Sequence, residues 1–215
     1  MKIKLMPAIT AFLLAGMAMC TALVQAQLAG KGGHSAWRVG DILFQQSTSG
    51  QCEAIRLATG SPWTHCGVLV EQEGEWFVCE AVQPVVMTPV DEFIRRGKSR
   101  PVAIRRMAAG LSDDQARIIT DYALAHVGFN YDLGFRWSDD EYYCSELVWK
   151  AYAAAGIELT SARPLKDYDL SSPVVKAIME KRYGKDIPLQ EPMVAPGDLL
   201  QSPLLLDPLE INRKR

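Results

Sequence analysis

Two strand-like segments joined by a short polar turn constrain the fold of this chain more than any other feature of its sequence. Residues 64–70 and 75–82 are each rich in strand-forming side chains, and only Glu71-Gln72-Glu73-Gly74 separates them. A connection this short indicates that the two segments pair as an antiparallel hairpin. The sequence therefore predicts a fold built on an antiparallel sheet.

Two amphipathic helices are predicted after the hairpin. The first begins at a capping box formed by Ser112 and Gln115 and ends at Gly128. The second covers about residues 143–155 and ends at Gly156. Shorter elements are also expected, namely strands at 39–44 and 102–106 and a helix at 52–59. With no tandem repeat and no linker in sight, residues 39–215 are predicted to form one α+β domain.

The first 26 residues have the features of a secretory signal peptide. Lys2 and Lys4 precede an uncharged run at 8–22, and Val24-Gln25-Ala26 provides a site for cleavage after Ala26. An uncleaved membrane anchor is the alternative, although the run is barely long enough to cross a bilayer. Residues 27–38 are Gly-rich and are predicted to be a flexible lead. We therefore expect a periplasmic or secreted protein.

Composition excludes several classes of function. The formal net charge is −2 over 215 residues, whereas a nucleic-acid-binding protein usually has a strongly basic face. The chain lacks a phosphate-binding loop, the G-x-S-x-G motif of serine hydrolases and the paired C-x-x-C spacing of zinc ribbons. We expect neither a metal site nor a cofactor.

Cysteines follow the predicted signal peptide at positions 52, 66, 79 and 144. An even number in an exported protein suggests two disulfides, but one reactive thiol with at most one bridge is the alternative. Cys144 lies in the first turn of the second predicted helix, where unpaired N–H groups and the helix dipole favour the nucleophilic thiolate. A buried structural cysteine is the competing interpretation.

A thiolate nucleophile needs a base, and three histidines are available: His34, His65 and His126. His65 opens an apolar strand and is the strongest candidate. If Val70 lies opposite Glu75, then His65 lies opposite Glu80, with their Cβ atoms roughly 5 Å apart. A three-residue loop with a bulge would instead place this pair on opposite faces of the sheet.

The same register predicts which cysteines lie opposite each other in the hairpin. It places Cys66 opposite Cys79, within bridging distance on the other face of the hairpin. We therefore predict a Cys66–Cys79 disulfide or a buried thiol pair, with Cys52 and Cys144 free.

Five segments taken together resemble the YiiX/YebB-like family, a branch of the NlpC-type superfamily. They are residues 40–44, 54–59, 63–68, 80–82 and 143–148, and the likeness runs from about 39 to 156 with a fainter echo at 195–203. The resemblance implies a circularly permuted papain-like α+β fold, with an antiparallel sheet packed against helices.

The resemblance also implies roles for individual residues. Cys144 is similar to the family's nucleophile, His65 to its base and Glu80 to the acid that orients the base. Tyr143 and Glu146 match the motif around the cysteine, and Glu146 could serve only to stabilise the helix. Three aromatic residues are expected to contact substrate: Tyr131, Tyr143 and Trp63.

The resulting hypothesis is an exported thiol hydrolase that cleaves an amide bond through an acyl-enzyme. Peptides, cell-wall peptides and lipid amides are all expected as substrate classes, and a location near a membrane or cell wall is compatible with them. The alternatives are an acyltransferase or a non-catalytic protein that binds lipid or peptidoglycan. Such a binding protein would use a groove lined by Trp63, Trp76, Phe129, Phe135 and Trp137. The sequence predicts no oligomeric state.

Overall fold

The computed structural model describes residues 37–97 and 102–208. The compact unit that begins at Arg38 has the following fold. The predicted signal peptide and residues 27–36 of the predicted lead lie outside the described residues. Among the residues that are described, no helix has the length and apolar character needed to span a membrane.

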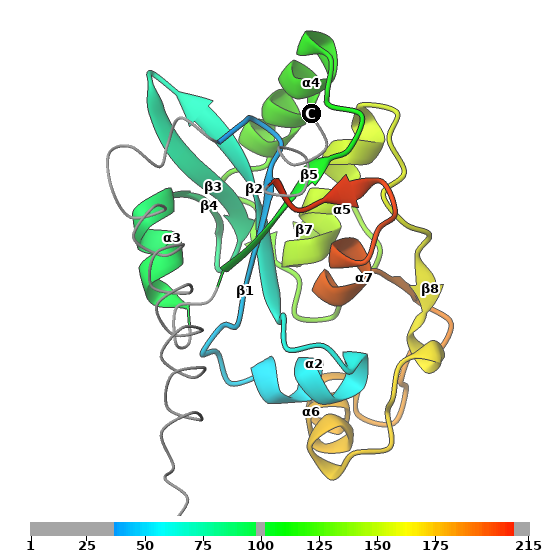
Figure 1. Cartoon of the computed structure of the whole chain (residues 1–215). Coiled ribbons are helices and arrows are strands. Elements are labelled where there is room, and N and C mark those ends of the chain that lie inside the picture. The colour runs from blue at the N-terminus through cyan, green and yellow to red at the C-terminus, as the bar shows by residue number, and fades with distance from the viewer. Residues whose placement is uncertain (1–36, 98–101, 209–215) are drawn as a thin grey trace, which may run out of the picture. The chain divides into compact units, whose positions relative to one another are not determined.

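A six-stranded antiparallel sheet forms the centre of this unit, which confirms the predicted α+β fold (Figure 1). Its order is β10-β5-β1-β2-β3-β4. The strands are β1 (Ile42–Gln45), β2 (His65–Gln72), β3 (Glu75–Ala81), β4 (Val85–Pro89), β5 (Val102–Met107) and β10 (Leu205–Leu206). Two small sheets complete the set, with β6 (Asn130–Tyr131) parallel to β7 (Glu141–Tyr142) and β8 (Arg163–Pro164) antiparallel to β9 (Pro192–Met193).

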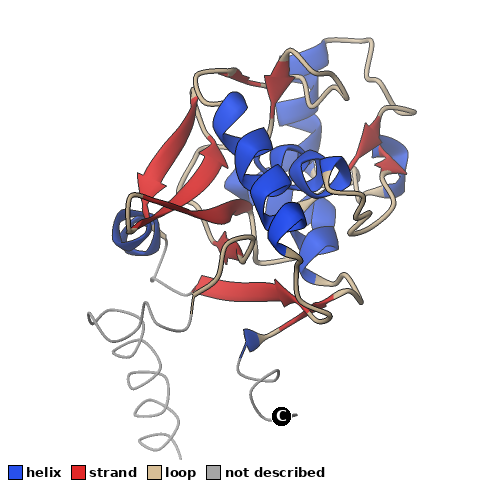
Figure 2. Ribbon diagram, turned by 90° about the horizontal axis from the view of Figure 1, so that it is seen from above, coloured by secondary structure: helices blue, strands red, loops and turns tan. Residues whose placement is uncertain are grey.

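Helices lie on both faces of the sheet (Figures 1 and 2). On one face, α4 (Asp113–Ala125) and α5 (Cys144–Ala154) cover the apolar side chains of β2 and β3. The thiol of Cys79 in β3 donates to the carbonyl oxygen of Ala123 in α4 at 3.4 Å. The other face packs against α3 (Val90–Arg96), whose Phe93 ring lies 5.9 Å from the ring of His65. The sheet thus has two helices on one face, and α3 covers part of the other at β3 and β4.

The described chain holds three more helices and one 3-10 turn. Helix α2 (Cys52–Thr59) packs against α6 (Pro173–Tyr183), and α7 (Pro196–Leu200) packs against α5. The 3-10 turn η2 (Leu165–Asp167) adds Leu165 to a second apolar cluster between α2 and α6, with Ala54, Val175 and Met179. This cluster lies at the lower end of the unit in Figure 1, away from the main core.

Both predicted helices after the hairpin are confirmed. The Ser112 hydroxyl accepts from the Gln115 N–H at 3.2 Å, and the Gln115 side chain accepts from the Ser112 N–H at 3.0 Å. This reciprocal pair is the predicted capping box at the start of α4. Helix α5 agrees with the expected 143–155 to within one residue at each end.

The predicted register of the hairpin is wrong by two residues. Only Glu73 and Gly74 form the turn, with φ of 54° and 83°, so Gln72 lies opposite Glu75 and Val68 opposite Cys79. Two consecutive positive φ angles are the mark of a type I′ turn, whose twist matches that of paired strands. The strand therefore continues through residues 71–72, which the prediction had assigned to the loop.

This shift changes the partners of the strand residues without changing their faces, because side chains alternate with a period of two. Glu80 lies opposite Gly67 instead of His65, but His65 and Glu80 stay on one face. Cys66 no longer lies opposite Cys79, and all four described cysteines are free thiols. The predicted disulfide is therefore wrong, and both residues are fully buried thiols on the α5 side of the sheet.

Candidate active site

Cys144 is the first residue of α5. Tyr143 before it has extended backbone angles, with φ −97° and ψ 164°, and the helix begins at Cys144. Glu146 accepts a hydrogen bond from the Tyr143 N–H at 3.4 Å and pairs with Lys150 at 3.0 Å. Burial raises the pKa of Glu146 to about 7, against the effect of Lys150. Glu146 thus stabilises the turn that presents Cys144, as one interpretation of the motif predicts.

His65 and Glu80 meet directly, although not as the opposite pair that the predicted register would give. Nε2 of His65 lies 2.5 Å from Oε2 of Glu80, and both side chains are buried. The contact is diagonal across the hairpin, because Glu80 is opposite Gly67. Gly67 makes the contact feasible, since a Cβ atom at this position would lie 2.5 Å from Val78 Cγ1 and 3.1 Å from Glu80 Cβ.

The Glu80 carboxylate has two further donors that sequence reasoning missed. The hydroxyl of Thr88 in β4 donates to Oε1 at 2.5 Å, and Nη2 of Arg96 in α3 donates to Oε1 at 2.7 Å and Oε2 at 2.5 Å. Burial opposes ionisation, but His65, Thr88 and Arg96 lower the pKa of Glu80 below its ordinary value. Glu80 is therefore an anion whose position is fixed from three elements.

The surroundings of Cys144 and His65 favour a thiolate–imidazolium pair. Burial works against the charged ring, but Cys144 and then Glu80 raise the pKa of His65 to about 9. The pKa of Cys144 is lowered well below that of a free thiol. The Cys66 side chain is the largest cause and His65 also lowers this pKa, whereas burial raises it. Since Nε2 binds Glu80, Nδ1 is the ring nitrogen left for the sulfur. Such a pair is the activated form of a cysteine nucleophile.

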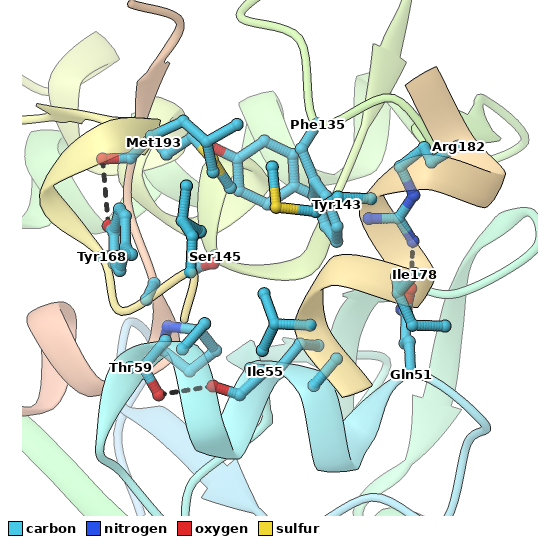
Figure 3. A pocket seen from close by; sticks show the side chains of 18 of the residues that line it. Gln51, Ile55, Thr59, Phe135, Tyr143, Ser145, Tyr168, Ile178, Arg182 and Met193 are labelled. Atoms are coloured by element: carbon cyan, nitrogen blue, oxygen red, sulfur yellow. Dashed lines mark hydrogen bonds between the residues drawn. The ribbon is translucent and has the colours of Figure 1, made fainter. Parts of the chain in front are cut away.

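An apolar cavity of about 720 Å³, its mouth included, opens beside Cys144 (Figure 3). Helix α2 forms its lower wall in this view, and α6 and the segment around Tyr168 and Met193 form the sides. Most of its walls are aliphatic, including Ala54, Ile55, Leu165, Val175, Ile178 and Met179. An organic group attached to the sulfur would enter an environment that favours hydrocarbon.

A second cleft of about 1120 Å³ lies on the His65 side and is more polar. Its walls include Thr64, His65 and Arg96. Gln51 and Tyr131 line both spaces, and the Gln51 amide donates to the Tyr131 hydroxyl at 2.8 Å. Arg182 in α6 donates to the other end of the Gln51 amide, also at 2.8 Å (Figure 3). The Gln51–Tyr131 pair therefore lies between an apolar and a polar compartment.

The remaining predicted site residues have different surroundings. Tyr131 and Tyr143 both line the apolar cavity, and the Tyr143 hydroxyl accepts from the Val194 N–H at 3.3 Å. Trp63 is half-buried against the main core and lines neither the cavity beside Cys144 nor the cleft beside His65. Sequence reasoning missed Gln51 and Arg182, which are distant in the chain and meet only in the folded protein.

The family described as "Permuted papain-like amidase enzyme, YaeF/YiiX, C92 family" matches residues 36–206. The chain belongs to this family. The fold and the resemblance predicted from sequence are thereby confirmed.

Two relatives are informative in detail. An uncharacterized protein, YiiX of Escherichia coli strain K12, is 43% identical over 173 residues, which cover 79% of this chain and 86% of YiiX. The crystal structure of the metalloprotein YiiX from Escherichia coli O157:H7 matches with a TM-score of 0.76 and 43% identity. That match covers 79% of this chain and 94% of the other. In residues 37–97 and 102–208 of the present chain, no three His, Cys, Asp or Glu side chains are grouped so as to fit a metal ion.

Proposed function

We propose that this protein is an exported cysteine amidase that works through Cys144, His65 and Glu80. The observation that carries the proposal is the buried contact between the Glu80 carboxylate and His65, together with a cysteine at the start of α5 whose pKa His65 lowers. The pKa shifts agree with these roles, because the pKa of Glu80 is lowered, that of His65 is raised and that of Cys144 is lowered.

The first half of the reaction forms an acyl-enzyme. The Cys144 thiolate attacks the amide carbonyl, and the resulting oxyanion lies near the N–H groups of the first turn of α5. The Tyr131 hydroxyl accepts from Gln51, so its own hydrogen is available to donate to this oxyanion. His65 gives its proton to the leaving amine as the carbon–nitrogen bond breaks, and Cys144 keeps the acyl group as a thioester.

The second half of the reaction restores the enzyme. Neutral His65 removes a proton from water, and the hydroxide attacks the thioester carbonyl. The carbon–sulfur bond breaks, the acid product leaves, and the thiolate–imidazolium pair forms again. Glu80 holds the ring orientation throughout and stabilises its charged form, while the Thr88 and Arg96 donors keep the carboxylate in place.

Of the three substrate classes expected from sequence, the cavities favour an amide with an apolar acyl group. The acyl group is attached to Cys144 and extends into the aliphatic cavity, whereas the amine leaves on the side of His65, where the cleft is polar. Lipid amides fit this division of apolar and polar parts better than peptides do.

The decisive experiment compares Cys144→Ala with Cys79→Ala in hydrolysis of a fluorogenic fatty amide. We expect the first variant to lose at least about a thousandfold in kcat with its circular dichroism unchanged, since no other group replaces the nucleophile. The second removes another buried thiol and should leave turnover within a factor of about two. Full turnover by Cys144→Ala would refute the proposal, and a Cys144 that alkylates no faster than a free thiol would favour the non-catalytic binding protein.

Export is proposed from the sequence of residues 1–26. Two lysines, an uncharged run and a small-residue cleavage site form the pattern that a signal peptidase recognises. Full-length protein expressed in a bacterium with a periplasm should yield a periplasmic product whose N-terminal residue is Gln27. Product that stays in the cytoplasm with residues 1–26 attached would contradict this.

A further inference from the structure

Three polar side chains at the boundary of the two compartments are joined by hydrogen bonds, and we call them the Arg182–Gln51–Tyr131 series. Nη2 of Arg182 donates to Oε1 of Gln51 at 2.8 Å, and Nε2 of Gln51 donates to the Tyr131 hydroxyl oxygen at 2.8 Å (Figure 3). Gln51 directly precedes α2, but its side chain does not cap that helix. The amide group of Gln51 instead connects α6 to the tyrosine in β6.

The direction of these hydrogen bonds follows from the chemistry of arginine. A guanidinium group has only N–H donors, so the Gln51 atom that faces Arg182 must be the carbonyl oxygen. The amide nitrogen then faces Tyr131 and donates to its hydroxyl oxygen. Because an amide nitrogen does not accept hydrogen bonds, the hydroxyl hydrogen of Tyr131 has to point away from Gln51.

Both ends of the series are held by the surrounding structure. The guanidinium carbon of Arg182 lies 4.2 Å from the centre of the Phe135 ring, within the range of a cation–π contact. Phe135 has a φ of 45°, a left-handed backbone conformation that bulky residues rarely adopt. At the other end, Tyr131 pairs with Tyr142 in the β6–β7 sheet, two residues before Cys144. Tyr131 and Cys144 therefore line the same cavity.

We propose that Arg182 and Gln51 are positioning residues that turn the Tyr131 hydroxyl hydrogen toward the oxyanion formed at Cys144. This inference rests on the proposed function, because the oxyanion forms only when Cys144 attacks a carbonyl carbon. Burial and the charge of Cys144 raise the pKa of Tyr131 well above its usual value, so the hydroxyl keeps its hydrogen. A donor that is oriented before substrate arrives needs no reorganisation as charge develops on the oxygen.

The first test reverses the direction of the series with one change of nearly equal size, Gln51→Glu, in the full-length protein. A carboxylate accepts from Arg182 at one oxygen and from the Tyr131 hydroxyl at the other, so the tyrosine hydrogen turns away from the oxyanion. For the lauroyl amide of aminomethylcoumarin, we expect kcat to fall about a hundredfold, as when an oxyanion donor is removed, with KM within a factor of about two. Tyr131→Phe lacks the hydroxyl group and should lose as much.

Variants of Arg182 test the start of the series. A glutamine at position 182 can accept as well as donate, so in Arg182→Gln the Gln51 amide can rotate and accept from Tyr131, and kcat should fall about tenfold. Arg182→Lys keeps a group that only donates and should hold kcat within a factor of about three of the wild type. Lys181→Gln removes an exposed charge from the same helix and should leave kcat unchanged.

A second measurement needs no turnover. The Cys144 thiolate adds to the carbonyl carbon of lauric aldehyde: a carbon–sulfur bond forms, the carbonyl π bond breaks, and its electron pair becomes an oxyanion on the oxygen. This reversible adduct protects Cys144 from iodoacetamide, which mass spectrometry of the peptide containing Cys144 detects. Alkylation without aldehyde forms no oxyanion and is the reference for each protein. We expect Gln51→Glu and Tyr131→Phe to need about tenfold more aldehyde for equal protection than the wild type and Lys181→Gln.

The two measurements separate this inference from the proposed function. Aldehyde protection at the wild-type level in Gln51→Glu or in Tyr131→Phe would overturn the inference, and so would a wild-type protein that the aldehyde fails to protect. If the wild type hydrolyses no amide, protection alone decides on the series, whereas the Cys144→Ala turnover experiment decides on the amidase. If Gln51→Glu fails to fold, Arg182→Gln and Tyr131→Phe still decide, because wild-type protection in both contradicts the proposal.

Discussion

Gly67 sets the geometry of the His65–Glu80 contact at the scale of a single residue. It lies opposite Glu80 in the hairpin, and a Cβ atom there would come within 2.7 Å of the Cys79 carbonyl oxygen as well as close to the Glu80 side chain. The absence of a side chain allows the carboxylate to lean across the ladder to the ring of His65. The diagonal contact therefore depends on glycine at this position.

We predict that Gly67→Ala separates the carboxylate from the imidazole. The extra methyl group has backbone on one side and Glu80 on the other, so the strands must shift, at a cost of about 1–3 kcal/mol in the free energy of unfolding. A displacement of this kind should lower kcat by about a hundredfold. Chemical denaturation and steady-state kinetics measure the two effects.

Gly74→Ala is the matched control for Gly67→Ala. Gly74 has a φ of 83° and no atom within 4 Å of a Cβ built there, so alanine brings backbone strain of about 1 kcal/mol without touching the site. Its kcat should equal that of the wild type. If both variants keep full kcat, the contact between His65 and Glu80 does not need glycine at position 67.

At the scale of elements, α3 supplies the cation that completes the buried carboxylate site. Arg96 lies in its last turn and reaches Glu80 from the face of the sheet opposite α5. A carboxylate with a lowered pKa stabilises the fold above its ordinary pKa of 4.5, and this contribution is lost as the pH falls through the lower folded-state value. Part of that contribution depends on Arg96.

We predict that Arg96→Ala lowers the free energy of unfolding by about 1 kcal/mol at pH 7, a modest value because the arginine side chain is 38% exposed. The deficit should shrink as the pH falls below 4.5 and through the lowered folded-state pKa of Glu80, because a protonated Glu80 no longer pairs with the Arg96 charge. Arg95→Ala changes an exposed arginine of the same helix and should have no such effect. Denaturant unfolding between pH 8 and about pH 2 measures this, and a deficit that stays constant over that range would contradict the role assigned to Arg96.

Which elements could be predicted from the sequence depends on how local their signals are. The capping box at Ser112 and the apolar face after Cys144 are complete within a few residues, and both helices form where expected. Helix α6 has a local signal too, since Ser172 caps it and Pro173 is its first residue, although it is not among the elements predicted from the sequence. The partners of Glu80 in β4 and α3 have no local signal, because tertiary packing alone brings them together.

At the scale of the whole molecule, segments distant in the chain divide the space around Cys144 into two compartments. Helices α2 and α6 enclose the apolar side, and the segments around Thr64 and Arg96 line the polar side. Gln51 and Tyr131 lie between them, and Arg182 anchors Gln51 from α6. Under the proposed function, the substrate amide lies across this boundary, with its two halves in environments of opposite character.

This division predicts how activity depends on the length of the acyl chain. Ile178 lies in the wall of the apolar cavity, so Ile178→Trp should fill part of the space that the acyl group occupies (Figure 3). We expect the KM for a long-chain fatty amide to rise about tenfold, while a two-carbon acyl amide, which does not reach the wall, keeps its kcat/KM within a factor of about two. Ala177→Trp places the same side chain on the exposed side of α6 and should change neither value. If Ile178→Trp affects short and long substrates equally, the acyl group does not occupy this cavity, and the polar cleft becomes the site for both halves of the substrate.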